Sequence, residues 1–97
     1  MYRIVYTKQA AKDVKNLKAA GLSGKAQKLI EIIKDDPFRS PPPYEGLVGN
    51  LSGYFSRRIN LQHRLVYQVY SEPVEDEDGI YEGTVKIIRM WTHYDGV

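Results

Sequence analysis

The chain has 97 residues, of which 42% are hydrophobic and 27% are charged. This length supports one hydrophobic core, so we expect a single domain spanning residues 1–97. The absence of cysteine, together with only two histidines, excludes disulfide scaffolds, zinc ribbons and thiol nucleophiles. No run is long and apolar enough to cross a bilayer, and the first residues lack a signal-peptide pattern. We therefore expect a cytoplasmic protein that does not interact with membranes.

The small net charge of +2 hides a strong asymmetry along the chain. Residues 1–70 carry a net charge of +7, whereas residues 71–97 carry −5, and six of the seven acids in that second part lie between Glu72 and Glu82. A basic body is typical of proteins that bind a polyanion such as nucleic acid, although a merely soluble surface has the same signature.

The first third of the sequence predicts one strand followed by two helices. The β-favouring residues of Tyr2–Thr7 indicate a strand, after which Thr7 can cap a helix that ends at Gly21. Ser23 is the candidate cap of a second helix, whose apolar stripe ends by about Asp36, before a proline.

The remainder predicts a sheet. A proline-rich connector at residues 40–43 leads to a glycine-rich loop at residues 44–53. Three strands follow, at Tyr54–Leu61, Arg64–Tyr70 and Thr84–Thr92. The first two are expected to pair as a hairpin, and the acidic segment 71–83 to project as a hairpin extension with a solvated tip, remote from the basic residues or at their edge. The order β-α-α-β-β-β predicts an α+β fold, with the N-terminal strand and two helices packed on a twisted antiparallel sheet.

Residue types alone point to RNA without establishing a reaction. Basic and aromatic side chains alternate around the predicted hairpin, which suits phosphate and base contacts, and the candidate RNA contacts are Arg57, Arg58 and Phe55. Neighbouring strand residues face opposite ways, so Arg57 and Arg58 cannot both reach one site. Ordinary strand packing with solvated arginines is the competing interpretation. Asp35 and Asp36 form an isolated acidic pair, more typical of a solvated helix end than of a metal site.

Three motifs together carry a resemblance to a known family. Residues 50–59 read N-L-S-G-Y-F-S-R-R-I, residues 63–67 read H-R-L-V-Y, and His93-Tyr94 follow near the end of the sequence. In this order and spacing they resemble the YoeB/Txe toxins of the RelE superfamily, and the likeness extends over nearly the whole chain.

The resemblance implies the toxin of a type II toxin–antitoxin system. It implies a ribosome-dependent endoribonuclease that cuts mRNA in the decoding site and so inhibits translation, without a metal or another cofactor. The implied partners are the ribosome, mRNA and a YefM/Phd-type antitoxin, with DNA approached only through the antitoxin complex. Homodimerisation is left open.

The resemblance also assigns roles to residues. Glu45, five residues before the N-L-S-G block, corresponds to the family's catalytic glutamate, and Arg64 to its catalytic arginine. His93 and Tyr94 correspond to the family's terminal pair. Glu45 would act as the base, His93 as the acid and Arg64 as the cation that stabilises the phosphoryl oxygens, while Tyr94 would stack on a base or orient the phosphate.

This sequence departs from the family in three respects. Leu47-Val48-Gly49 stands where many relatives have Leu-Lys-His, the segment 71–83 is longer and more acidic, and three residues follow Tyr94. Two alternatives stay open: a non-enzymatic gyrase inhibitor of the ParE type on the same fold, and an RNA-binding module without activity. The acidic segment either improves solubility, or repels ribosomal RNA, or contacts a basic antitoxin segment.

Overall fold

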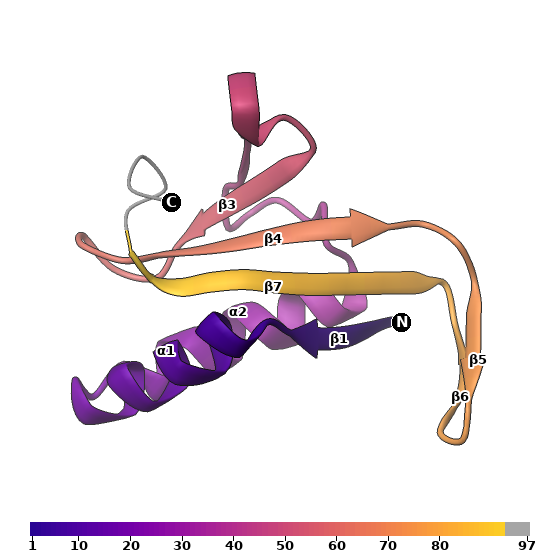
Figure 1. The fold of residues 1–97 in the computed structure, drawn as a ribbon, viewed down its shortest axis with the longest axis horizontal. Helices are drawn as coiled ribbons and strands as arrows, with labels where there is room; N and C mark the ends of the chain where they lie inside the picture. Colours follow the sequence, from indigo (N-terminus) through magenta and orange to yellow (C-terminus); the bar gives the residue numbers. More distant parts are fainter. Residues whose placement is uncertain (93–97) are drawn as a thin grey trace.

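The computed structural model describes residues 1–92, which form a sheet covered on one face by two helices (Figure 1). The predicted residues His93 and Tyr94 lie outside the described residues. Within residues 1–92, none of the helices has the length and apolar character needed to span a bilayer.

The N-terminal unit follows the prediction closely. Strand β1 (Tyr2–Tyr6) leads into helix α1 (Lys8–Ala19), and Thr7 caps this helix by accepting a hydrogen bond of 3.0 Å from the Ala10 N–H. Helix α2 (Ser23–Asp35) follows a turn in which Gly21 has a φ of +73°, a conformation that favours glycine. Ser23 does not cap this helix, because it is already the first helical residue and the preceding Leu22 has no side-chain acceptor.

The five-stranded sheet has the order β1-β7-β4-β3-β2. Strands β3 (Tyr54–Arg58), β4 (Arg64–Tyr70) and β7 (Gly83–Thr92) pair antiparallel, as predicted, and a two-residue strand β2 (Glu45–Gly46) adds to the β3 edge. Strand β1 pairs parallel with β7, so the sheet is mixed rather than entirely antiparallel. The two helices between β1 and the rest of the chain provide the crossover that parallel pairing requires.

Strand β3 ends three residues earlier than predicted. The side-chain carbonyl of Asn60 accepts hydrogen bonds from the backbone N–H groups of Gln62 and His63, at 2.9 and 2.7 Å. This turn closes the β3–β4 hairpin and removes Leu61 from the ladder, since asparagine side chains satisfy backbone donors that a strand would otherwise use.

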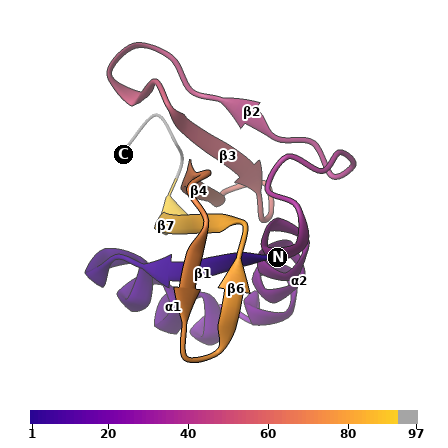
Figure 2. The ribbon, with the colours of Figure 1, turned by 90° about the vertical axis from the view of Figure 1, so that its right-hand side faces the viewer.

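The hydrophobic core lies between the helices and one face of the sheet. It combines apolar residues of both helices with Leu65 and Tyr67 of β4 and Val85 and Ile87 of β7, all four of which are fully buried. Phe55 and Arg57 of β3 pair with Tyr67 and Leu65, so the alternate residue Ser56 and its cross-strand partner Glu45 point to the opposite face. The two helices leave that face of the sheet uncovered (Figure 2).

The acidic segment forms a separate two-stranded hairpin of β5 (Val74–Asp76) and β6 (Gly79–Tyr81). The turn residues are Glu77 and Asp78, and Gly79, which follows them, has a φ of +135°. The hairpin projects from the end of the molecule opposite the start of β4 (Figure 1).

Candidate active site

Strands β2, β3 and β4 bring together one side chain each on the open face of the sheet. Arg64 donates from its terminal nitrogen to Glu45 Oε1 at 2.6 Å and from Nε to the hydroxyl of Ser56 at 2.5 Å. Glu45 pairs with Ser56 across β2 and β3, and Arg58 pairs with Arg64 across β3 and β4. The strand register therefore fixes this cluster, since directly opposed residues on a sheet face the same side.

The side chains of the cluster differ in how deeply they are buried. Ser56 is completely buried and the Arg64 side chain is only 13% exposed, whereas the Glu45 side chain is 48% exposed. Arg64 is thus held in a fixed orientation from below, while the carboxylate of Glu45 lies in solvent. A fixed planar guanidinium is suited to gripping two phosphate oxygens.

The cluster opens into a pocket of about 420 Å³. The pocket is lined by Pro43, Tyr44, Glu45, Arg58 and Arg64. Two guanidinium groups and one carboxylate give the pocket an excess of positive charge, which attracts a phosphodiester. Among residues 1–92, no group of three or more His, Cys, Asp or Glu side chains is arranged to hold a metal ion.

Arg57, a predicted RNA contact, lies apart from this pocket. Its side chain is completely buried on the helix-covered face and donates hydrogen bonds to the hydroxyl of Tyr67 and to the backbone carbonyls of Pro37, Arg39 and Pro42, at 2.7 to 3.1 Å. The structure does not bring Arg57 to the pocket, because its guanidinium is held on the opposite face of β3 by these four hydrogen bonds. Instead it fixes the connector that leads to Glu45.

Phe55 is also placed away from the cluster. It lies on the same face of β3 as Arg57 and contacts the rings of Phe38, Tyr44 and Tyr67, with centroid separations of 5.2 to 6.0 Å. Because Tyr44 directly precedes β2, the contact with its ring helps to hold the beginning of that strand. The structure therefore does not bring Phe55 together with Glu45 and Arg64, and of the three predicted RNA contacts only Arg58 lines the pocket.

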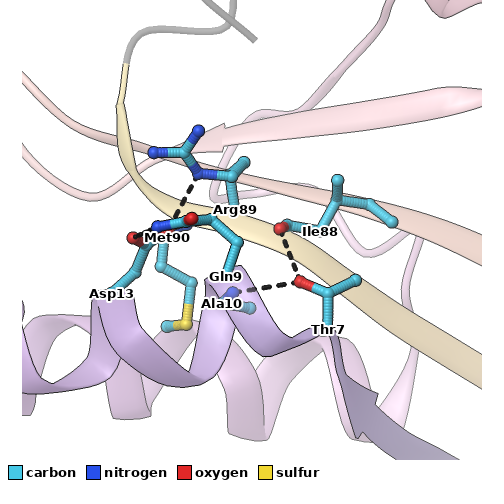
Figure 3. A network of polar contacts seen from close by, with 7 residues as sticks. All are labelled: Thr7, Gln9, Ala10, Asp13, Ile88, Arg89 and Met90. Carbon is cyan, nitrogen blue, oxygen red and sulfur yellow. Dashed lines mark hydrogen bonds and ion pairs between the residues drawn. The ribbon is translucent and has the colours of Figure 1, made fainter.

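Helix α1 holds the end of β7 through two side chains that the sequence analysis did not single out for this purpose. The β4–β7 register shifts on either side of Val66, so that β7 bulges near Ile88 and Met90. Thr7 donates from its hydroxyl to the Ile88 carbonyl at 2.9 Å, and Asp13 accepts from the Met90 N–H at 2.9 Å (Figure 3). Backbone groups at the bulge are thereby satisfied by α1 instead of by the ladder.

Asp13 is the centre of this network. It is completely buried, and it also accepts from the side chains of Arg89 and Gln9, each at 3.0 Å (Figure 3). Beyond the bulge, β7 ends at Thr92, which pairs with Arg64. The network therefore fixes the strand segment that reaches the candidate site.

Two further residues support the same end of the sheet. The imidazole of His63 stacks on the indole of Trp91, with centroids 3.9 Å apart and planes inclined by 13°. This stack joins the β3–β4 turn to the end of β7, next to Arg64. His63 is the first residue of the H-R-L-V-Y motif. Its packing against Trp91 is visible only in the fold.

The fold agrees with the comparisons to known proteins. A family model described as the YoeB-like toxin of bacterial type II toxin–antitoxin systems matches residues 6–94. The chain belongs to this family. The YoeB motifs of the sequence thus coincide with the pocket, since Glu45, Ser56, Arg58 and Arg64 all fall within or beside them.

Individual YoeB relatives show the same likeness. A YoeB toxin of Synechocystis is 56% identical over 41 residues, which are 42% of this chain and 48% of that protein. The match thus spans about half the length of this curated relative. The structure of the YoeB dimer from Staphylococcus aureus is 30% identical, covers 96% of this chain and 98% of its own, and has a TM-score of 0.74.

A second structure from Staphylococcus aureus is a YoeB–YefM complex. It is 32% identical, covers 97% of this chain and 99% of its own, and has a TM-score of 0.69. This coverage confirms the predicted α+β, RelE-like architecture over nearly the full length. The predicted recognition as a type II toxin of the YoeB family is likewise confirmed.

Proposed function

We propose that the chain is an endoribonuclease that cuts mRNA on the ribosome and so inhibits translation. The observation that carries this proposal is the contact of 2.6 Å between Arg64 and Glu45 in an open, positively charged pocket. A phosphate entering the pocket would compete with Glu45 for the guanidinium. Once the phosphate is bound, Arg64 would contact the reacting group, and the carboxylate of Glu45 would be released beside it.

The reaction that these groups support is attack by the 2′-oxygen of a ribose on its own 3′-phosphorus. Glu45 would take the 2′-hydroxyl proton as a general base while the bond from phosphorus to the 5′-oxygen of the next nucleotide breaks. Arg64 would stabilise the charge that grows on the phosphoryl oxygens, and its hydrogen bond to Ser56 keeps it oriented for this purpose. The products would be a 2′,3′-cyclic phosphate and a 5′-hydroxyl.

The leaving 5′-oxygen requires a proton, and the family resemblance supplies the candidate donor. We assign this role to His93, and stacking on a base or orienting the phosphate to Tyr94. Both lie outside the described residues. Their support is that β7 ends at Thr92 directly opposite Arg64, and that α1 fixes the segment before it.

The proposed partners follow from the relatives. A YoeB protein forms a complex with YefM and another structure holds a YoeB dimer, so we propose a YefM/Phd-type antitoxin and a homodimer for this chain. The ribosome is a further proposed partner, mRNA is the proposed substrate, and the cytoplasm is the proposed location. We further propose that the chain acts as a single toxin domain to which residues 71–83 add an acidic extension.

Primer extension on a translated mRNA tests this function. The wild type should produce ribosome-dependent 5′ ends at defined positions, and Arg64→Ala should reduce cleavage about 100- to 1000-fold, as expected for loss of a preorganised electrostatic group. Lys15→Ala, on the exposed side of α1, is the matched control and should cleave normally. Cleavage by Arg64→Ala at the control rate would exclude the proposed role of this arginine.

A gyrase assay separates the alternative on the same fold. Inhibition of DNA supercoiling by the wild type, without any mRNA cleavage, would replace the proposed function with the ParE-type activity. Loss of both activities in a folded protein would leave the RNA-binding module.

A further inference from the structure

A second hollow adjoins the Glu45–Arg64 pocket and shares Pro43 and Arg58 with it. It has a volume of about 780 Å³ and is lined further by Lys25, in the first turn of α2, and by residues 59–62 between β3 and β4. Because the two hollows have lining residues in common, they form one groove that runs from the candidate catalytic pair toward the beginning of α2.

The second hollow has a cationic lining. Lys25 and Arg58 are exposed, and in the described part of the chain no hydrogen bond or ion pair engages either side chain. No aspartate or glutamate is among the residues that line this hollow. Two cations without a protein counter-ion favour an anionic ligand in solvent-accessible space.

The same hollow also offers apolar surface. Leu61, at the tip of the β3–β4 turn, is 86% exposed. It projects because the Asn60 side chain holds the turn through hydrogen bonds to Gln62 and His63. The exposed leucine can pack against the face of a base, and the lysine and arginine of the same hollow can bind phosphate. Single-stranded nucleic acid requires both kinds of contact.

We propose that this hollow is a second RNA subsite, which holds the nucleotide next to the scissile phosphate. Lys25 and Arg58 contact the backbone phosphate between the two subsites, and the base packs on Leu61 and Pro43. This inference rests on the proposed function, because the RNA must pass through the Glu45–Arg64 pocket. RNA is favoured over an acidic protein segment because the groove is continuous with a pocket suited to a phosphodiester.

The test is cleavage of ribosome-bound mRNA under single-turnover conditions, measured against toxin concentration in a salt series. Lys25→Ala and Leu61→Ser should each raise the half-saturating toxin concentration several-fold while the maximal rate stays at the wild-type value. For Lys25→Ala the dependence of log affinity on log salt should also fall, by about 0.7 for one lost contact to a single strand. Lys15→Ala removes a lysine from a helix outside the groove and should change neither quantity.

The source of the RNA is settled by repeating the measurement with mRNAs truncated on either side of the cleavage position. If truncation abolishes the effect of Lys25→Ala, the mRNA itself occupies the subsite, as proposed. If the effect persists, ribosomal RNA occupies the hollow and the proposed subsite for the cleaved strand is overturned. The subsite would be overturned if Lys25→Ala had the same half-saturating concentration and the same salt slope as Lys15→Ala. It would also be overturned if Lys25→Ala lost affinity for the antitoxin alone, because the hollow would then bind a protein.

The proposed function and the subsite fail in different ways. Absence of cleavage by the wild type would overturn the function, whereas cleavage with unchanged kinetics in Lys25→Ala would overturn only the subsite. Cosedimentation of the wild type and the variants with ribosomes measures the RNA contact independently of the reaction.

Discussion

Replacing Asp13 with alanine tests whether α1 holds the bulged end of β7 through a buried carboxylate. The side chain is completely buried and accepts hydrogen bonds from Gln9, Arg89 and the Met90 N–H. Alanine would leave the Met90 N–H without its partner and Arg89 without its counter-ion. A buried unsatisfied donor costs about 1–3 kcal/mol, and breaking a buried ion pair costs about 3–5 kcal/mol.

The expected loss lies below the summed costs of about 4–8 kcal/mol. The Arg89 side chain is 27% exposed, so water can solvate part of its guanidinium after the substitution. We therefore expect Asp13→Ala to lower the free energy of unfolding by about 3 kcal/mol. Since small domains are stable by about 5–15 kcal/mol, the variant would still fold but close to the margin.

Urea unfolding provides the measurement, and Glu31→Ala provides a matched control. Glu31 accepts a hydrogen bond of 2.8 Å from Gln27 one turn earlier, as Asp13 does from Gln9, but it is exposed, and within residues 1–92 no hydrogen bond or ion pair joins it to β7. The control should cost a few tenths of a kcal/mol. A loss for Asp13→Ala no larger than that of the control would refute the view that this carboxylate anchors the strand.

Three further predictions address the connector, the pH dependence and the chemistry. Arg57→Lys should lower the free energy of unfolding in urea by about 2–4 kcal/mol and should slow cleavage, because an ammonium group cannot replace four hydrogen bonds that fix the segment before Glu45. A free energy of unfolding equal to that of the wild type would contradict this prediction. Burial raises the pKa of Tyr67 above its usual 10.0, so the unfolded chain ionises first and stability should fall as the pH rises past 10. Tyr67→Phe should weaken that fall, and an unchanged alkaline slope would show that other groups cause it. A chelator should not slow cleavage of mRNA already bound to ribosomes in a buffer that keeps them assembled, whereas a metal-specific stimulation would contradict the acid–base mechanism.

The sequence predicted the parts of the fold that local patterns determine. The first strand, both helices and the β3–β4 hairpin follow from residue periodicity and turn residues. Alternation along β3 also indicated that Arg57 and Arg58 face opposite sides, which the structure confirms with one buried and one exposed guanidinium.

Other features depend on contacts between distant residues and were not accessible from local patterns. The parallel pairing of β1 with β7 joins the two ends of the described chain, and no local signal distinguishes it from an antiparallel pairing. Asp13 resembles any acid in a charged helix until the bulge of β7 is placed beside it. The importance of Glu45 came from the family resemblance, since a glutamate in a loop gives no sign that two strands will bring it to Arg64.

The most direct test of the central claim is to replace one ribose at the cleavage position of a ribosome-bound mRNA with deoxyribose. The proposed mechanism makes the 2′-oxygen the nucleophile, with Glu45 acting on it and Arg64 acting on the phosphate. It therefore predicts that the deoxy-substituted mRNA is not cut at that position, while the unmodified mRNA yields a 2′,3′-cyclic phosphate. Cleavage of both mRNAs at equal rates, or a product that ends in a free 3′-hydroxyl, would contradict the account.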